Sequence, residues 1–150
     1  MRRAQRLDHF RDGLDHAEKE HRARLSAAET KVGEARARLG ELQRYRDDYL
    51  RSLGERTAGG IDAAALRDYH AFVARIGEAV RQQALLLSRT ELECEFERHR
   101  WNEAATRTRA VASVVERWRQ EERVTVARAE QREADDWAPQ RRQRPNLENS

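Results

Sequence analysis

Residues 52–61 read Ser-Leu-Gly-Glu-Arg-Thr-Ala-Gly-Gly-Ile and hold three of the seven glycines in the chain. Glycine commonly ends helices because it adopts positive φ angles without steric cost. Asp62 follows directly and is a suitable N-cap for a second helix. We therefore predict a first helix over about residues 3–55, a turn at 56–61 and a second helix over about 62–138.

The C-terminal residues are set apart by proline, because Pro139 and Pro145 are the only prolines in the chain. A proline lacks the amide N–H of a helix interior and its ring clashes with the preceding turn. Pro139 is therefore predicted to end the second helix. Residues 139–150 are polar and basic, and we expect them to form a disordered tail.

The composition favours long helices over a compact globule. Of the 150 residues, 38% are charged and only 6% are aromatic. Few apolar residues and few turn formers are typical of coiled coils, although so polar a chain could also be disordered. The periodicity of the apolar residues decides between these two classes.

An apolar stripe runs along the second predicted helix at alternating spacings of three and four, which indicates a coiled-coil seam. One heptad series comprises Leu66, Val73, Val80, Leu87, Cys94, Trp101, Thr108 and Val115. The companion series comprises Tyr69, Ile76, Gln83, Thr90, Glu97, Ala104, Val111 and Trp118. Polar residues interrupt the middle of this second series.

The first predicted helix has a matching stripe with one irregularity. Its members are Leu7, Phe10, Leu14, Ala17, Leu25, Ala28, Val32, Ala35, Leu39, Leu42 and Tyr49. The phase slips by one residue between Ala17 and Leu25, which predicts a stutter that locally unwinds the supercoil.

A short turn between two long helices makes them antiparallel neighbours. Folding about the glycines places residue i opposite about residue 119 − i, so that Leu39 faces Val80 and Leu25 faces Cys94. We therefore predict an all-α fold, one antiparallel two-helix coiled-coil hairpin over residues 1–138 with unequal arms. The second helix should extend beyond its partner from about residue 118.

The charge pattern and the cysteine content limit the possible environments. The 30 basic and 27 acidic residues are interleaved, which is typical of solvated coiled coils. A basic coiled coil that binds nucleic acid remains an alternative, but the interleaved acids argue against it. Cys94 is the only cysteine, and we find no secretory signal and no apolar run of about 18 residues. We expect a cytosolic protein.

The sequence contains no motif that indicates catalysis. Neither of the glycine-rich phosphate-binding patterns occurs. His16 and His21 are five residues apart, which turns a helix by about 500° and points the two rings to different faces. Cys94 lies at a seam position, where cysteine acts as a small apolar residue. We predict a protein with no catalytic residue, no metal site and no cofactor.

Four aromatic residues gather on either side of the predicted turn. Tyr49 and Tyr69 occupy seam positions, whereas Tyr45 and Phe72 lie one position off the seam. Exposed aromatic side chains are effective contact residues because they bury much area with few rotatable bonds. Packing within the hairpin and contact with a partner both remain open for this group.

The middle of the chain carries a longer pattern that resembles the flagellar FliJ family. It reads Leu42-x-x-Tyr45-Arg46-x-Asp48-Tyr49-x-x-x-Leu53, then Gly60-Ile61, then Leu66-x-x-Tyr69-x-x-Phe72-x-x-x-Ile76-x-x-Ala79-x-x-x-Gln83. The stretch from Glu130 to Asp136 is similar to that family's ending, with Arg132 and Asp136 as substitutions. The resemblance covers about residues 5–138.

The resemblance implies a cytoplasmic component of the flagellar type III export apparatus, located at the cytoplasmic face of the inner membrane at the flagellar base. The implied partners are the hexameric export ATPase, the cytoplasmic domain of the export gate membrane protein, and export chaperones. The gate-binding residues implied by the motif are Tyr45, Tyr49, Phe72, Ile76, Ala79 and Gln83. The stalk of a virulence-type secretion system has a similar fold and is the nearest alternative.

The resemblance places the ATPase contact at the end of the hairpin away from the turn. This region covers about residues 5–25 and 100–135. Trp118, Gln131 and Asp135 are the individual candidates within it.

Overall fold

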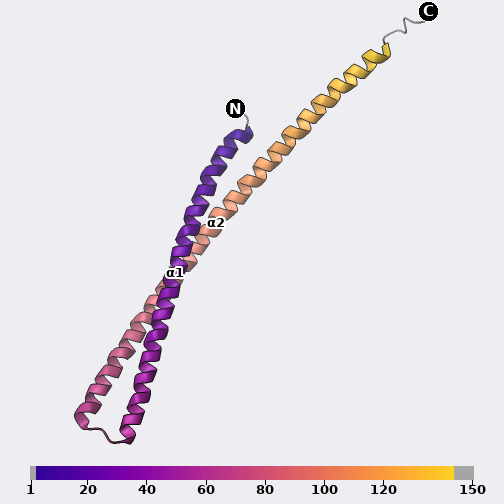
Figure 1. Cartoon of the computed structure of the whole chain (residues 1–150). Helices are drawn as coiled ribbons and strands as arrows, with labels where there is room; N and C mark the ends of the chain where they lie inside the picture. Colours follow the sequence, from indigo (N-terminus) through magenta and orange to yellow (C-terminus); the bar gives the residue numbers. More distant parts are fainter. Residues whose placement is uncertain (1–2, 144–150) are drawn as a thin grey trace, which may run out of the picture. The chain divides into compact units, whose positions relative to one another are not determined.

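The computed structural model describes residues 3–143 and contains two helices, α1 (Arg3–Ala58) and α2 (Ala63–Gln143) (Figure 1). The helices are antiparallel and pack against each other, which confirms the predicted all-α hairpin. They contain 56 and 81 residues, or roughly 85 and 120 Å at 1.5 Å per residue. The arms are therefore unequal, as the sequence predicts.

The turn is shorter than predicted and occupies residues 59–62. α1 continues to Ala58, three residues beyond the predicted end, and the hydroxyl of Thr57 donates to the carbonyl oxygens of Leu53 and Gly54, both at 3.0 Å. Gly60 adopts a φ of 83°, the left-handed conformation that favours glycine. This residue lets the chain leave α1.

Asp62 begins the second helix as its N-cap, as predicted. Its carboxylate oxygen accepts hydrogen bonds from the amides of Ala64 at 2.6 Å and Ala65 at 3.1 Å. Its carbonyl oxygen accepts the first helical bond, from the amide of Leu66 at 3.0 Å. The cap satisfies two amides that the first turn of any helix leaves without partners.

The chain divides into two compact units. The turn-proximal unit comprises Ala17–Ala104, and the terminal unit comprises Met1–His16 and Ala105–Ser150. Tyr69, Ile76 and Cys94 are among the buried residues of the turn-proximal unit, and Val115 is fully buried in the terminal unit. Each unit therefore has its own short apolar core between α1 and α2.

The seam of α2 follows the predicted heptads. All sixteen predicted positions from Leu66 to Trp118 are buried or half-buried. Two of the polar members find hydrogen bonds, Gln83 to the carbonyl oxygen of Ala35 at 3.1 Å and Thr90 to that of Leu87 at 2.9 Å. These bonds explain how the seam tolerates polar residues.

The phase slip predicted in α1 is not needed to describe its seam, because one series of buried and half-buried positions keeps spacings of four and three along the whole helix. They are Leu7, Arg11, Leu14, Glu18, His21, Leu25, Ala28, Val32, Ala35, Leu39, Leu42, Arg46, Tyr49 and Leu53. Phe10 is 58% exposed and lies off the seam. The apolar pattern seems to slip only because Glu18 and His21 occupy seam positions.

Ion pairs between the helices agree with an unbroken register. They join Asp8 to Arg119, Glu29 to Arg98 and Arg36 to Glu91. Residue i pairs with residue 127 − i in every case, and successive pairs are separated by whole heptads. A four-residue insertion in one helix would have shifted this relation.

The prediction that Pro139 ends the second helix is wrong. The backbone of α2 remains helical to Gln143. A proline has a helical φ and removes only its own donor, so a helix can continue past it at the loss of one hydrogen bond and some steric cost. Residues 144–150 of the predicted disordered tail lie outside the described residues.

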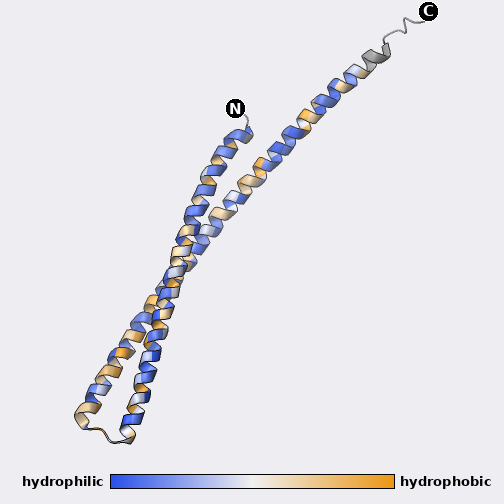
Figure 2. Ribbon diagram, viewed as in Figure 1, coloured by the Kyte–Doolittle hydropathy of each residue, from blue (hydrophilic) through white to orange (hydrophobic). Residues whose placement is uncertain are grey.

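The apolar residues are dispersed along both helices. Figure 2 shows them alternating with hydrophilic residues, as a narrow seam requires. Within the described range, neither helix contains a segment that is both long and apolar enough to cross a membrane.

Candidate partner-binding surfaces

The four aromatic residues near the turn form one cluster across α1 and α2. The ring of Tyr49 lies between those of Tyr69 and Phe72, with centroid distances of 4.4 and 4.2 Å. The ring of Tyr45 meets that of Phe72 edge to face, at 6.0 Å and 78°. Edge-to-face and tilted pairs are favourable arrangements for aromatic rings. The cluster therefore holds its own members in fixed positions.

Tyr69 is the buried base of this aromatic cluster. Its side chain is 5% exposed, and its hydroxyl donates a hydrogen bond to the backbone carbonyl oxygen of Tyr49. A buried tyrosine hydroxyl needs such a partner because an unpaired polar group in the core is costly. Tyr69 is thus a structural residue that positions Tyr49.

Tyr45 is the exposed member of the cluster, with 54% of its surface accessible. Phe72 and Tyr49 are half-buried, so each presents part of its ring to solvent. The predicted gate-binding residues Tyr45, Tyr49 and Phe72 are therefore brought together on one accessible surface, which we call the aromatic surface.

The remaining predicted gate-binding residues differ in accessibility. Ile76 is only 7% exposed and packs in the seam, so it has little area to offer a partner. The amide of Gln83 donates to the carbonyl oxygen of Ala35, which commits this group to the contact between the helices. Ala79 is half-buried on α2. Ile76 and Gln83 therefore serve the packing between the helices more than they offer area to a partner.

Charged side chains flank the aromatic surface on α2. Glu78 accepts hydrogen bonds from the amide of Gln82 at 2.9 Å and from Arg81 at 2.6 Å. These hydrogen bonds, the one from Gln82 first, and the positive charge of Arg81 lower the pKa of the Glu78 carboxyl. Glu78 is therefore charged at neutral pH and offsets the charge of Arg81.

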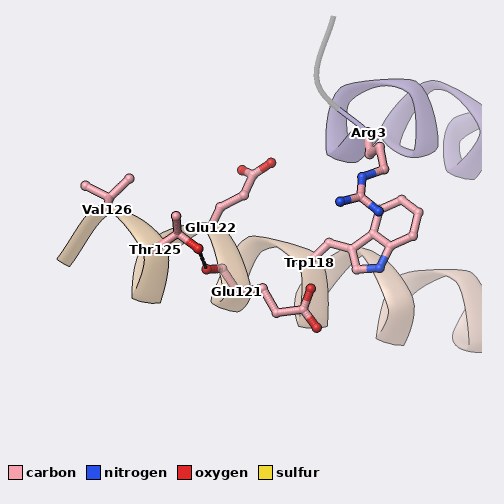
Figure 3. A pocket seen from close by; sticks show the side chains of 6 residues that line it. All are labelled: Arg3, Trp118, Glu121, Glu122, Thr125 and Val126. Atoms are coloured by element: carbon pink, nitrogen blue, oxygen red, sulfur yellow. Dashed lines mark hydrogen bonds between the residues drawn. The ribbon is translucent and has the colours of Figure 1, made fainter. Parts of the chain in front are cut away.

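The terminal unit contains a second accessible feature around Trp118. The guanidinium of Arg3 lies over the Trp118 ring (Figure 3), 5.3 Å from its centre. The indole is half-buried beneath this cation and lines a shallow hollow together with Glu121, Glu122 and other residues of the next turns of α2. Stacking of a guanidinium on an indole is a cation–π contact.

From residue 123 to residue 138, α2 is exposed on every side. All residues from 123 to 138 are exposed, among them Val126 at 56% and Trp137 at 60%. The candidates Gln131 and Asp135 lie here, and the amide of Gln131 donates to the carboxylate of Asp135 at 3.1 Å. This stretch has no cover from α1 within the described residues, as the predicted overhang requires. We call it the exposed arm of α2.

Two features of these surfaces were not predicted from the sequence. Arg3 makes a cation–π contact with Trp118, but nothing in the sequence distinguishes this arginine from the many others. Leu85, Leu86, Leu92 and Phe96 are all more than 40% exposed on α2. The sequence does indicate exposed apolar residues here, because Leu85 and Leu86 come directly before the seam residue Leu87. One seam does not use three consecutive leucines.

The histidines lie as their spacing predicts. His21 is half-buried in the seam, whereas His16 is exposed. Within residues 3–143, no three side chains of the metal-ligating types converge.

Comparison with known proteins identifies the family. A family model described as flagellar FliJ protein matches residues 3–147, nearly the whole chain. The chain belongs to the FliJ family. Neither the curated proteins nor the solved structures contain a match to this sequence. The predicted membership in the FliJ family is thereby confirmed.

Membership in the FliJ family places the chain among the components of flagellar type III protein export. The family is a non-catalytic one, so its chemistry is that of contact with other proteins. The aromatic surface and the exposed arm of α2 both offer accessible aromatic area, through Tyr45 and Trp137.

Proposed function

We propose that this chain links the hexameric flagellar export ATPase to the cytoplasmic domain of the export gate protein, and that it escorts export chaperones. The observation that carries the proposal is the FliJ family match over residues 3–147 together with two accessible surfaces in separate units. A protein with two such surfaces can hold two partners at once without any catalytic group.

The aromatic surface is the proposed gate-binding site. Tyr45, Tyr49 and Phe72 supply the contact area, while the buried Tyr69 holds the Tyr49 ring from the core. Rings held in position before binding lose little conformational entropy when a partner covers them. A partner with an apolar pocket for the Tyr45 ring would fit this geometry.

The exposed arm of α2 and the Trp118 hollow form the proposed ATPase-binding region. Trp118, Val126 and Trp137 supply apolar area there. An exposed helix gains little stability from its own hydrogen bonds, so it benefits from packing against a partner. Gln131 and Asp135 lie on the same stretch and are candidates for polar contacts.

The proposed link works through differential affinity. A connector biases an export gate only if its contacts differ between the open and closed gate, because equal affinity for both states shifts nothing. The ion pairs and the two seams set a fixed register between α1 and α2 within each unit. Within each unit, a partner that binds one helix therefore also constrains the position of the other helix.

The proposed location is the cytoplasm, at the inner face of the membrane at the flagellar base. This follows from the proposed partners, since the gate domain is cytoplasmic and the ATPase assembles beneath it. The contact with the membrane would be indirect, through the gate protein.

The gate contact is tested with Tyr45→Ala and Phe72→Ala and their double variant, in a binding titration against the purified cytoplasmic domain of the cognate gate protein. Leu50→Ala is the matched control, because Leu50 is a 42% exposed apolar residue of α1. Circular dichroism checks that every variant remains helical. We expect the double variant to bind at least about tenfold more weakly, and unchanged binding would remove the assigned surface.

The ATPase contact is tested with Trp118→Ala and Val126→Ala against the cognate ATPase. Phe10→Ala is the control, since Phe10 is 58% exposed on α1 of the same unit. Restoration of motility in a strain that lacks the gene measures the combined function. Full binding and full motility by the Trp118→Ala and Val126→Ala double variant would contradict the proposed region.

A further inference from the structure

A second apolar stripe runs along α2 on the side away from its seam. Leu85, Leu92 and Phe96 are 53%, 73% and 59% exposed and are spaced by seven and four residues. This spacing places them on one helix face. Leu86, at 44% exposure, widens the stripe toward α1. We call these four residues the outer patch. It lies entirely within the turn-proximal unit.

Small residues and charged groups border the outer patch. Phe96 lines a shallow hollow between α1 and α2, together with Arg24, Ala27, Ala28, Lys31, Glu93 and Glu97. The guanidinium of Arg100 stacks 5.3 Å from the centre of the Phe96 ring. The patch is therefore an apolar strip with ionic edges, which is the usual composition of a helix contact surface.

Most charges near the outer patch are already paired within the chain. Arg81 binds Glu78, Arg98 binds Glu95 and His99 binds Glu103. Arg89 and Glu93 lie one turn apart beside Leu92, and neither makes an ion pair in the part of the chain that the structure describes. Two unpaired charges of opposite sign thus flank the most exposed leucine.

The positions of these groups match a two-fold axis. An antiparallel pair of α2 helices related by such an axis near residue 91 would place residue i opposite residue 182 − i. Arg89 would then face Glu93 of the other copy, twice, and Leu86 would face Phe96. Leu92 lies one residue from the axis, so the two copies of Leu92 would be offset by only two residues, about 3 Å along the helix axis. Such reciprocal contacts are what an isologous dimer interface requires.

We propose that the outer patch binds a second copy of this chain, with the two α2 helices antiparallel and crossing near residue 91. The shared contact covers about three turns of each helix, so we expect a reversible dimer in the micromolar range, weaker than a standard interface. The aromatic surface and the exposed arm of α2 lie outside this contact. The inference does not depend on the proposed export function.

The first test is sedimentation equilibrium of the full chain from low micromolar to several hundred micromolar. We expect a monomer–dimer equilibrium that Leu92→Gln weakens at least about tenfold. Leu92 is 73% exposed and glutamine is a good helix former, so the variant should fold. Val126→Gln, at another exposed apolar site on α2, is the control and should leave the equilibrium unchanged.

The second test uses charge reversal to examine the two-fold arrangement itself. Arg89→Glu would bring two acidic residues together across the axis, and Glu93→Arg would bring two basic residues together. Each single variant should therefore be monomeric where the wild type dimerises, whereas an equimolar mixture of the two should form a heterodimer. The double variant should dimerise like the wild type.

Three results would overturn the proposal. The wild-type chain could remain monomeric at all these concentrations. It could associate equally well with Leu92→Gln, which would place the contact elsewhere. The mixture of charge-reversed variants could remain monomeric, which would exclude the pairing of Arg89 with Glu93.

Discussion

The hydroxyl of Tyr69 on α2 donates a hydrogen bond to the backbone carbonyl oxygen of Tyr49 on α1. The two rings are also in contact, with centroids 4.4 Å apart and planes tilted by 33°, so one pair of residues combines a packing contact with a polar one. This pair ties the helices together directly beneath the aromatic surface.

Removal of the Tyr69 hydroxyl should weaken the hairpin without dismantling the aromatic cluster. Tyr69→Phe keeps the ring but loses the bond, and we expect a loss of about 1 kcal/mol in the free energy of unfolding. Urea denaturation followed by circular dichroism measures it. Tyr45→Phe is the control, because Tyr45 is 54% exposed. Equal stability of Tyr69→Phe and the wild type would show that the bond contributes nothing.

Glycine substitutions should have opposite effects in the turn and in the helix. Gly60→Ala places a β-carbon on a backbone with a φ of 83°, and we expect a loss of roughly 1 kcal/mol. Gly33 lies within α1 with no atom near its added β-carbon, so Gly33→Ala should stabilise by up to about 1 kcal/mol. Thermal denaturation of both variants measures the two effects. A stabilising Gly60→Ala would contradict the turn geometry.

Ile76 and Tyr45 should separate stability from binding. Ile76 is 7% exposed, so Ile76→Ala should lower the free energy of unfolding by about 2 kcal/mol or more. Tyr45→Ala removes an exposed ring and should lower it by much less, while it weakens the proposed gate contact. Denaturation and gate-domain binding are measured on both variants. If Ile76→Ala weakened gate binding and Tyr45→Ala lowered only the stability, then Ile76, and not Tyr45, would be the contact residue.

Replacing a polar residue of the seam with an apolar one should raise the free energy of unfolding of the hairpin. One carboxylate oxygen of Glu97 and the Nδ1 atom of His21 are buried without a hydrogen-bond partner among the described residues. A buried polar atom without a hydrogen bond has lost its contact with water and gained no partner in exchange, which destabilises the folded state. Glu97→Leu should therefore raise the free energy of unfolding by about 1 kcal/mol, as measured by urea denaturation. A less stable variant would indicate that Glu97 is solvated or paired in solution.

The α2 seam could be predicted in full from the sequence, and the α1 seam only in part. In α2 the residues at heptad positions are mostly apolar, so the repeat from Leu66 to Trp118 is visible directly. In α1 the seam includes Glu18 and His21, while Phe10 lies outside it. A search for apolar residues alone follows Phe10 and then has to introduce a phase slip.

The accessibility of individual site residues could not be predicted. Tyr45, Ile76 and Gln83 belong to one sequence pattern, yet the first is exposed, the second is buried and the third bonds to the other helix. Tyr45 lies off the seam, whereas Ile76 and Gln83 occupy the same heptad position and differ because only glutamine carries an amide that must find a hydrogen bond. The sequence pattern therefore located the surface, and the structure distinguished its contact residues from its supports.

The bare stretch of α2 at residues 123–138 also has a practical consequence. Amides in a helix without neighbours open frequently, so they exchange with solvent deuterium rapidly and are cut readily by proteases. A partner that covers this stretch would slow both reactions there and leave Tyr69 and its surroundings as they were. Mass spectrometry of the exchanged peptides can therefore report occupancy of the arm in a whole assembly, without any label or substitution.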